Sequence, residues 1–261
     1  MKSKFIALIT DFGTNDSFVS SMKGVIYSRY PSASVIDITH QIQAQNIKMG
    51  AFYIMVTMQY MPKNTLFIAV IDPDVGTGRG ILWAKTKDYQ FICPDNGLIS
   101  WISEKEEILE SRFINNSDLF LPKISPTFHG RDIMAPAAAE IAKGLKETKI
   151  GPIFNEYRKF PFPHPVRSGN NITGEVLSVD NYGNVITNIT REYVNVKSIF
   201  TVGGKIIKGL KLTYASVNDK EPLCLIGSFG FLEFSIRNGN FAQIYNVKPG
   251  DKIEAIVSLD E

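Results

Sequence analysis

Short apolar runs alternate with helical patterns along the first half of the chain. Phe5–Thr10 and Leu66–Ile71 are continuous apolar runs, which is typical of buried strands in a parallel sheet. In residues 18–26 and 47–58 the apolar positions recur three or four apart, which predicts two amphipathic helices, and a third helix is predicted over Arg131–Gly144. This alternation predicts a Rossmann-like α/β domain whose mostly parallel sheet carries helices on both faces.

The second half of the chain has a different pattern. Four prolines interrupt residues 151–171, which predicts a linker packed on the surface. Short apolar runs separated by turn residues follow it, and they predict a smaller β-barrel domain. These runs are Ile172–Asp180, Val185–Ile189, Ser198–Val202, Leu223–Ile226, Phe231–Ile236 and Lys252–Val257. The sequence therefore predicts an α/β domain over 1–150, the linker, and a barrel over 172–261.

Composition and charge exclude several classes of protein. The 28 Lys and Arg nearly balance the 26 Asp and Glu, and this argues against the basic stripe that nucleic acid binding needs. No run approaches the roughly 20 apolar residues of a membrane span, and the apolar run at the start ends at Asp11, too soon for a signal peptide. Two cysteines and three scattered histidines give neither a disulfide framework nor a clustered metal site, so we expect a reducing, cytoplasmic location.

Polar segments follow two of the predicted buried strands. Thr10–Asp16 follows the first of them, and the segment between Asp72 and Arg79 follows the second. Ligands of open α/β sheets bind outside the carboxyl ends of the strands, where a carboxylate such as Asp11 can accept both hydroxyls of a ribose. The structural alternatives are that Asn15 or Asp16 caps the next helix and that Asp72 and Arg79 form an ion pair.

The third predicted helix begins in another polar segment, Thr127–Asp132. Gly130 is expected to leave the backbone beside His129 open to a ligand. A lone histidine is more often structural, but His129 stands at a helix start beside charged groups, which favours a function. Pro94–Gly97 is by itself only a turn.

The predicted barrel contributes a polar loop within Asp180–Asn188. It is either a hairpin turn or a ligand loop, in which Tyr182 stacks on a flat heterocycle and Asn184 bonds its edge. Gly227–Gly230, which includes Ser228, is a second turn or ligand loop.

Taken in order, these segments resemble the family of S-adenosylmethionine (SAM) hydrolases, also called SAM hydroxide adenosyltransferases. The halogenating enzymes that act on SAM are relatives of this family. The resemblance covers nearly the whole chain, and an ordered set is much more specific than any single motif. The matching motifs are TDFGTND, DITH, DPDVGTGR, PDNG, TFHGRD and NYGNVITN. The resemblance implies an N-terminal α/β domain, a C-terminal β-barrel and a homotrimer. In that trimer the site lies between the first domain of one subunit and the barrel of the next.

The resemblance also implies roles for individual residues of the first domain. Asp72, Arg79 and His129 match the family's catalytic set around the attacking water. Asp11 resembles the acid that holds the ribose diol, and Asp16 matches an acid that lines the site.

Four residues of the barrel match substrate-binding positions. Asp180 resembles the residue that receives the methionine amino group, and Ser228 resembles one near the methionine carboxylate. Tyr182 and Asn184 resemble adenine contacts. The resemblance implies no metal and no cofactor, since SAM is the substrate.

Several positions depart from the family pattern. Asp74 stands where hydrolases usually have Gly, Phe18 where Tyr is common, and Gln45 and Phe229 where halogenases have Trp and Arg. Asp72 points away from halogenation, because the fluorinating enzyme has Tyr there and a carboxylate repels a halide.

The implied reaction is attack of water or hydroxide at the ribose C5′ carbon of SAM, which gives adenosine and L-methionine. Arg79 and His129 stabilise the developing hydroxide, and any member of the set with Asp72 is a candidate to take the proton. Three alternatives remain open: a SAM- or nucleoside-binding module without catalysis, a SAM-dependent halogenase, and a metal-dependent phosphohydrolase. The last would use Asp11, Asp72, Asp95 and His129 as ligands.

Overall fold

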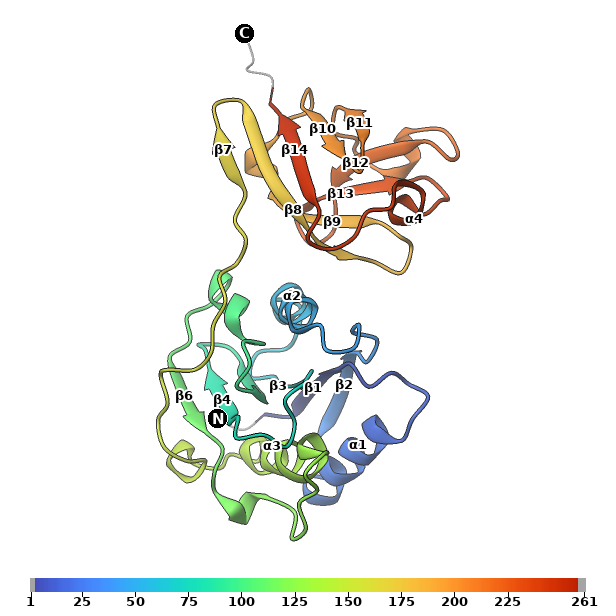
Figure 1. The fold of residues 1–261 in the computed structure, drawn as a ribbon. Coiled ribbons are helices and arrows are strands. Elements are labelled where there is room, and N and C mark those ends of the chain that lie inside the picture. Colours follow the sequence, from blue (N-terminus) through green and yellow to red (C-terminus); the bar gives the residue numbers. More distant parts are fainter. Residues whose placement is uncertain (1–2, 258–261) are drawn as a thin grey trace. The chain divides into compact units, whose positions relative to one another are not determined.

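The computed structural model describes residues 3–257 and forms two compact units, one ending at Phe162 and the other beginning at Pro163. Figure 1 shows the helices and strands of each unit in the order of the chain. No helix among the described residues is long and apolar enough to span a membrane.

The first unit is built on one six-stranded sheet in the order β2-β1-β3-β5-β4-β6. β4 runs opposite to the other five strands, which are parallel to one another, so the prediction of a mostly parallel sheet is confirmed. The strands are β1 (Phe5–Thr10), β2 (Ser34–Thr39), β3 (Leu66–Val70), β4 (Ile81–Lys85), β5 (Gln90–Pro94) and β6 (Glu110–Phe113).

Helices cover both faces of this sheet, as the alternating pattern predicts. The helices are α1 (Phe18–Arg29), α2 (Ile47–Met58) and α3 (Ala135–Ala142). On one face α1 and α3 pack together, and Met22 and Ile26 of α1 are fully buried there. Ile54 and Met58 of α2 belong to the core of the opposite face. The third predicted helix is shorter than expected, because Gly130–Met134 forms one wide π-type turn before α3 begins.

The second unit is an antiparallel sheet in the order β11-β10-β14-β8-β9-β13-β12, with β7 paired to β8. The end strands β11 and β12 contact each other, so the sheet is a nearly closed, barrel-like structure. Its core includes Phe200, Phe234 and Phe241. The elements are β7 (Val166–Ser168), β8 (Asn171–Val179), β9 (Val185–Thr190), β10 (Ile199–Val202), β11 (Lys205–Lys208), β12 (Pro222–Ile226), β13 (Phe231–Ile236), α4 (Phe241–Tyr245) and β14 (Lys252–Ile256).

The proline-rich segment 151–171 is divided between the two units. Its first part packs on the first unit, where Phe154 stacks on Phe113 with ring centroids 3.8 Å apart and Phe160 meets Trp101 edge to face. Its second part contains β7, which pairs with β8. Aromatic side chains among the prolines explain why this segment packs instead of extending as a free chain.

Single turns of 3-10 helix connect several of these elements. They are Ser100–Glu104, Ser117–Leu119, Glu147–Lys149, Arg191–Tyr193 and Tyr214–Ser216.

Candidate active site

Two candidate acids follow adjacent strands in the middle of the parallel sheet. β1 and β3 are neighbours, and Thr10 at the end of β1 is in register with Val70 at the end of β3. Asp11 therefore comes directly after β1, and Asp72 follows two residues after β3. The strand order reverses at this point, which is where ligands of open α/β sheets bind.

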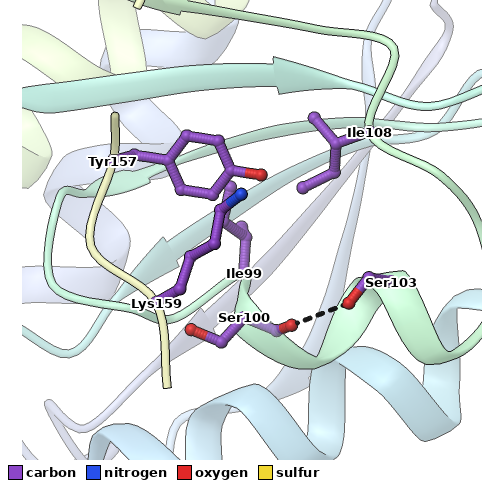
Figure 2. A pocket seen from close by; sticks show the side chains of 6 residues that line it. All are labelled: Ile99, Ser100, Ser103, Ile108, Tyr157 and Lys159. Carbon is purple, nitrogen blue, oxygen red and sulfur yellow. Dashed lines mark hydrogen bonds between the residues drawn. The ribbon is translucent and has the colours of Figure 1, made fainter. Parts of the chain in front are cut away.

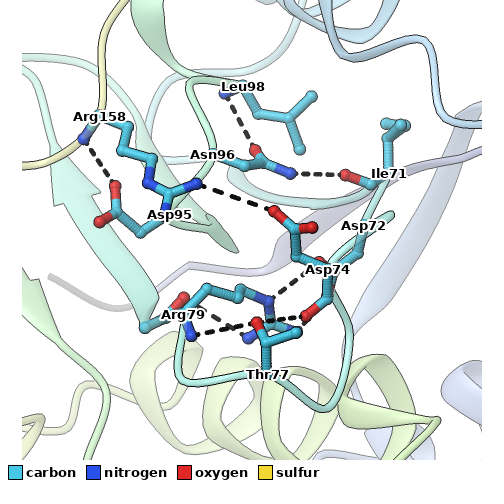
Figure 3. Close-up of polar contacts among 10 residues, drawn as sticks. Ile71, Asp72, Asp74, Thr77, Arg79, Asp95, Asn96, Leu98 and Arg158 are labelled. Atoms are coloured by element: carbon cyan, nitrogen blue, oxygen red, sulfur yellow. Dashed lines mark hydrogen bonds and ion pairs between the residues drawn. The ribbon is translucent and has the colours of Figure 1, made fainter.

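Asp72, Arg79 and His129 form one connected group. The Arg79 guanidinium donates from Nε to Asp72 Oδ1 over 2.9 Å and from Nη2 to Oδ2. Nη2 also lies 3.1 Å from His129 Nδ1. The Arg79 and Asp72 side chains are 2% and 6% exposed, so their charges neutralise each other almost out of contact with water. Figure 3 shows the two-pronged Asp72–Arg79 contact.

The contact with Arg79 fixes how the His129 ring can be used. A guanidinium has only donors, so Nδ1 must be the acceptor, and the neutral ring carries its hydrogen on Nε2. Burial of the ring and, next, the Arg79 charge lower the pKa of His129 below its ordinary value of 6.5, while Asp72 acts in the opposite direction. His129 is therefore neutral at pH 7 and offers an N–H donor at Nε2.

The loops that carry this group touch through a glycine. Gly76 has a φ of 82°, and a Cβ there would come within 2.6 Å of the Pro126 carbonyl oxygen. The Asp72–Arg79 loop can therefore lie directly against the loop that precedes His129. Asp132 is fully buried and accepts from Ser125 N over 2.8 Å, which fixes that second loop from within.

Gly130 has a role different from the one expected. It is buried, and a Cβ there would lie 3.3 Å from both Met22 Sδ and Val70 Cγ1. Its small size lets the turn after His129 pack against α1 and β3. The expectation that it opens the backbone to a ligand is wrong, because core atoms occupy that space.

Asp11 is half-buried and held by one visible contact. Its Oδ2 accepts from the backbone N–H of Gln45 over 2.8 Å, and Gln45 has the left-handed φ of 65° that aims this N–H. Asp16 lies in the exposed turn before α1 and makes no hydrogen bond or ion pair among residues 3–257. Capping of α1 by Asp16 is not observed, since Ser17 is the residue at that position and makes no side-chain cap bond.

The departure at Asp74 has a partner. Arg158 lies with Nη1 3.8 Å from Asp74 Oδ2, and both side chains are about half exposed or more. The backbone N–H of Arg158 donates to Asp95 Oδ1 over 2.7 Å, so segment 151–162 is tied to both loops (Figure 3). Asn96 donates to the Ile71 carbonyl over 2.8 Å, which fixes the chain just before Asp72.

The four candidates in the second unit lie around the turns of the barrel-like sheet. Asp180 accepts from the backbone N–H groups of Tyr182 and Asn184 over 2.8 and 2.9 Å, and from Asn184 Nδ2 over 2.8 Å. These bonds build the hairpin turn that was the structural alternative. Tyr182 is 76% exposed, so its ring remains available for stacking. Ser228 lies exposed in the turn between β12 and β13.

One pocket of the first unit is lined by residues other than these candidates. It has a volume of about 170 Å³ and is shown in Figure 2. It is lined by Ile99, Ser100, Ser103, Ile108, Tyr157 and Lys159. None of these is a candidate site residue.

The potential metal ligands are scattered in the part of the chain that the structure describes. Within residues 3–257 no three His, Cys, Asp or Glu side chains are grouped so that they could hold a metal ion. Asp72 is bonded to Arg79, and Asp95 accepts from Arg158 N.

The sequence matches a known family over both units. Residues 6–151 match the SAM hydroxide adenosyltransferase N-terminal domain, and residues 174–254 match the C-terminal domain of the same family. The chain belongs to the SAM hydroxide adenosyltransferase family.

Named relatives agree with this membership, and a solved structure has a similar fold. A protein of Methanocaldococcus jannaschii named (R)-S-adenosyl-L-methionine hydrolase is 36% identical, over 96% of this chain and 95% of its own. A protein of Actinoplanes sp. named fluorinase is 26% identical, over 94% of this chain and 95% of its own. The crystal structure of a conserved protein from Thermotoga maritima has a TM-score of 0.92 and 35% identity, and the match covers 96% of this chain and 99% of that one.

Sequence reasoning did not find the contacts that hold the candidate residues of this family member. Gln45 was noted only as a departure, although its N–H holds Asp11. Asp132 and Arg158 fix the two loops of the Asp72–Arg79–His129 group, and no motif marked them for that role. The charged pair Arg131-Asp132, which follows His129 and Gly130, was the one available signal for Asp132.

Proposed function

We propose that the protein hydrolyses SAM to adenosine and L-methionine. The observation that carries this proposal is the buried Asp72–Arg79 pair in contact with half-buried His129, beside the carboxyl ends of β1 and β3, in a chain of this family. Water attacks the ribose C5′ carbon, the C5′–S bond breaks, and its electron pair leaves on sulfur as neutral methionine. Because a sulfonium is an excellent leaving group, the protein needs only to align the water and to accept its proton.

The contacts of the three catalytic candidates support a different part for each of them. Arg79 Nη2 blocks Nδ1 of His129, so His129 acts through the N–H on Nε2 and stabilises negative charge on the attacking oxygen. Arg79 has no acceptor, and the free nitrogen of His129 is already protonated. Asp72 is then the member that receives the proton, while its pairing with Arg79 holds the carboxylate in place.

The remaining candidate residues bind the substrate in this proposal. Asp11 accepts the ribose hydroxyls, and Asp16 lines the site beside it. In the second unit Tyr182 stacks on adenine and Asn184 bonds its edge, which the 76% exposure of the Tyr182 ring supports.

The methionine end of SAM is assigned to two other residues of the second unit. Asp180 receives the amino group and Ser228 contacts the carboxylate. Both assignments rest on the family motif, and the Asp180 carboxylate also serves its own turn.

Other features of the proposal follow from family membership. We propose a homotrimer with active sites at subunit interfaces, a Rossmann-like first domain, a closed C-terminal barrel and a cytoplasmic location. Both cysteines, Cys93 and Cys224, are buried and free, which is usual in a reducing compartment. The reaction as written needs no cofactor.

Product analysis tests this function. Purified protein is incubated with the separated R and S sulfonium forms of SAM, because the name of the Methanocaldococcus jannaschii relative specifies the R form. Chromatography is expected to show equal amounts of adenosine and methionine. The release of adenosine and methionine is expected to continue in EDTA, and this result would exclude a metal-dependent phosphohydrolase. Added chloride or fluoride must give no 5′-halo-5′-deoxyadenosine, which sets aside a halogenase. SAM bound for hours without product would instead identify a binding module and overturn the proposal.

A further inference from the structure

His40 binds the chain on both sides of Asp11. It follows directly after β2, and it is 6% exposed. Its ring Nδ1 lies 2.9 Å from Thr10 Oγ1, and its backbone carbonyl accepts from Gly13 N over 2.7 Å. Thr10 and Gly13 enclose the short turn that begins with Asp11, and Gly13 has the left-handed φ of 71° that closes it. The turn is therefore fastened to His40 through the residues at its two ends.

The ring of His40 is itself held in one orientation. Nε2 lies 3.0 Å from Asp37 Oδ1, and this close charged contact takes the place of a well-aligned hydrogen bond, which Nε2 makes to no residue within 3–257. Lys23 Nζ lies 2.6 Å from the other oxygen of Asp37. Although burial acts to raise it, the contacts with Lys23 and His40 lower the pKa of Asp37, so this residue is a carboxylate at neutral pH.

These contacts set the direction of each hydrogen bond. A carboxylate only accepts, so a hydrogen on His40 Nε2 is the arrangement that suits the contact with Asp37. Nδ1 then accepts from the Thr10 hydroxyl, whose oxygen accepts from the backbone N–H of Phe12 over 3.2 Å. The chain of bonds runs from α1 through β2 and ends on the residue next to Asp11.

The carboxylate at the end of this chain is held on one side only. Asp11 Oδ2 accepts from Gln45 N, and Oδ1 makes no hydrogen bond to any residue that the structure describes. A fixed carboxylate with a free oxygen suits two neighbouring hydroxyl donors, because both can bind it without reordering the turn.

We infer that His40 is a positioning residue, which holds the Asp11 turn so that the Asp11 carboxylate meets the 2′ and 3′ hydroxyls of a ribose. The inference rests on the proposed function, since it deepens the binding role of Asp11 in that same site. His40 itself does not touch the substrate; it acts through Thr10 and Gly13.

The test compares the binding of adenosine and 2′-deoxyadenosine to the full-length protein by calorimetry. The two ligands differ only in one hydroxyl of the diol, so the ratio of their dissociation constants reports the Asp11 contact. A hydrogen bond to a charged group makes adenosine bind about tenfold more tightly or better in the wild type. Asp11→Asn is expected to remove most of this ratio.

Substitutions at two residues then separate positioning from stability. His40→Asn and Thr10→Val are expected to reduce the ratio to about threefold or less, because the turn is no longer fixed. Thr10→Ser keeps the hydroxyl and is expected to keep the ratio. Thr65→Val is the matched control and is expected to keep the ratio: Thr65 is equally buried, its hydroxyl donates to the Pro62 carbonyl, and it precedes β3 at the end of the strand away from Asp11.

The outcomes are distinct. If His40→Asn and Thr10→Val weaken both nucleosides equally and leave the ratio unchanged, His40 is only a structural residue and the inference is overturned. It is also overturned if the wild type does not discriminate, or if Asp11→Asn discriminates as well as the wild type. Adenosine release from SAM is measured separately on the same samples, so a failure of the proposed function is seen independently of the binding ratio.

Discussion

The Asp72–Arg79–His129 group and the Asp180–Asn184 turn contrast sharply in how their polar groups are used. In the first, Arg79 and Asp72 are 2% and 6% exposed, and their contacts leave His129 Nε2 as a donor with a defined direction. In the second, all the contacts of Asp180 close its own hairpin, and Tyr182 is 76% exposed.

This difference separates chemistry from binding. Charges that are buried and paired before the substrate arrives stabilise a transition state without reorganisation, and in a low dielectric they act strongly. An exposed ring on a rigid turn presents its flat face for stacking on a ligand. Changes in the first region should therefore lower the turnover rate, and changes in the second should weaken binding.

Asp72→Asn should give the largest effect. The substitution keeps the shape of the side chain but removes the charge that pairs with Arg79 and the acceptor for the proton. Turnover of SAM is expected to fall about 10³-fold, with the KM for SAM changed only a few-fold. Steady-state kinetics measure both constants. If the KM for SAM rises while turnover is unchanged, Asp72 binds the substrate, and the two regions do not differ in function.

Protonation of His129 should give the next largest effect. Because burial and Arg79 lower its pKa below 6.5, the ring is neutral at pH 7, and turnover should decline about tenfold per pH unit once the pH falls below that pKa. The unfolded chain takes up this proton at higher pH, so the associated stability is complete above pH 6.5 and decreases as the pH falls below it. A pH–rate profile and acid melting curves measure these effects. In His129→Gln the declines of turnover and of stability with falling pH should both become shallower. If the variant loses turnover at low pH as the wild type does, another group titrates.

Tyr182→Ala tests the second region. Loss of a stacking ring should raise the KM for SAM about tenfold and leave kcat within about twofold. Because the ring is mostly exposed, the melting temperature should not change. Tyr182→Phe is the matched control and should keep the wild-type KM. A fall in kcat at saturating SAM would contradict the assignment of this turn to binding alone.

The smallest effect is expected at Asp74. Its pairing with Arg158 is exposed and 3.8 Å long, so it contributes little in water. Asp74→Asn should alter kcat and melting temperature only slightly, and Arg158→Gln should do the same. A loss of activity approaching that of Asp72→Asn would show that Asp74 acts within the catalytic group.

Apolar periodicity predicted the main elements well but not the weakly patterned ones. β1, α1, α2 and β3 were predicted because buried parallel strands and two-sided helices leave strong patterns. The strand over Glu110–Phe113 was missed because its four residues are mostly polar and pair only at the sheet edge.

The candidate site could be located from sequence but not assembled. Polar residues after two apolar strands pointed to Asp11 and Asp72, and strand adjacency brings them to one edge. The contacts that orient them depend on tertiary structure. The left-handed backbone of Gln45 and the bond between Thr10 and His40, 30 residues apart, leave no periodic trace in the sequence.

The origin of the new oxygen atom is the most direct test of the central claim. SAM is incubated with the wild-type protein in ¹⁸O-labelled water, and the adenosine is analysed by mass spectrometry. The account predicts one ¹⁸O atom at the 5′ hydroxyl, with methionine unlabelled, and near-complete loss of labelled adenosine with Asp72→Asn. Adenosine without ¹⁸O, label in methionine, or intact SAM after prolonged incubation would contradict attack of water at C5′.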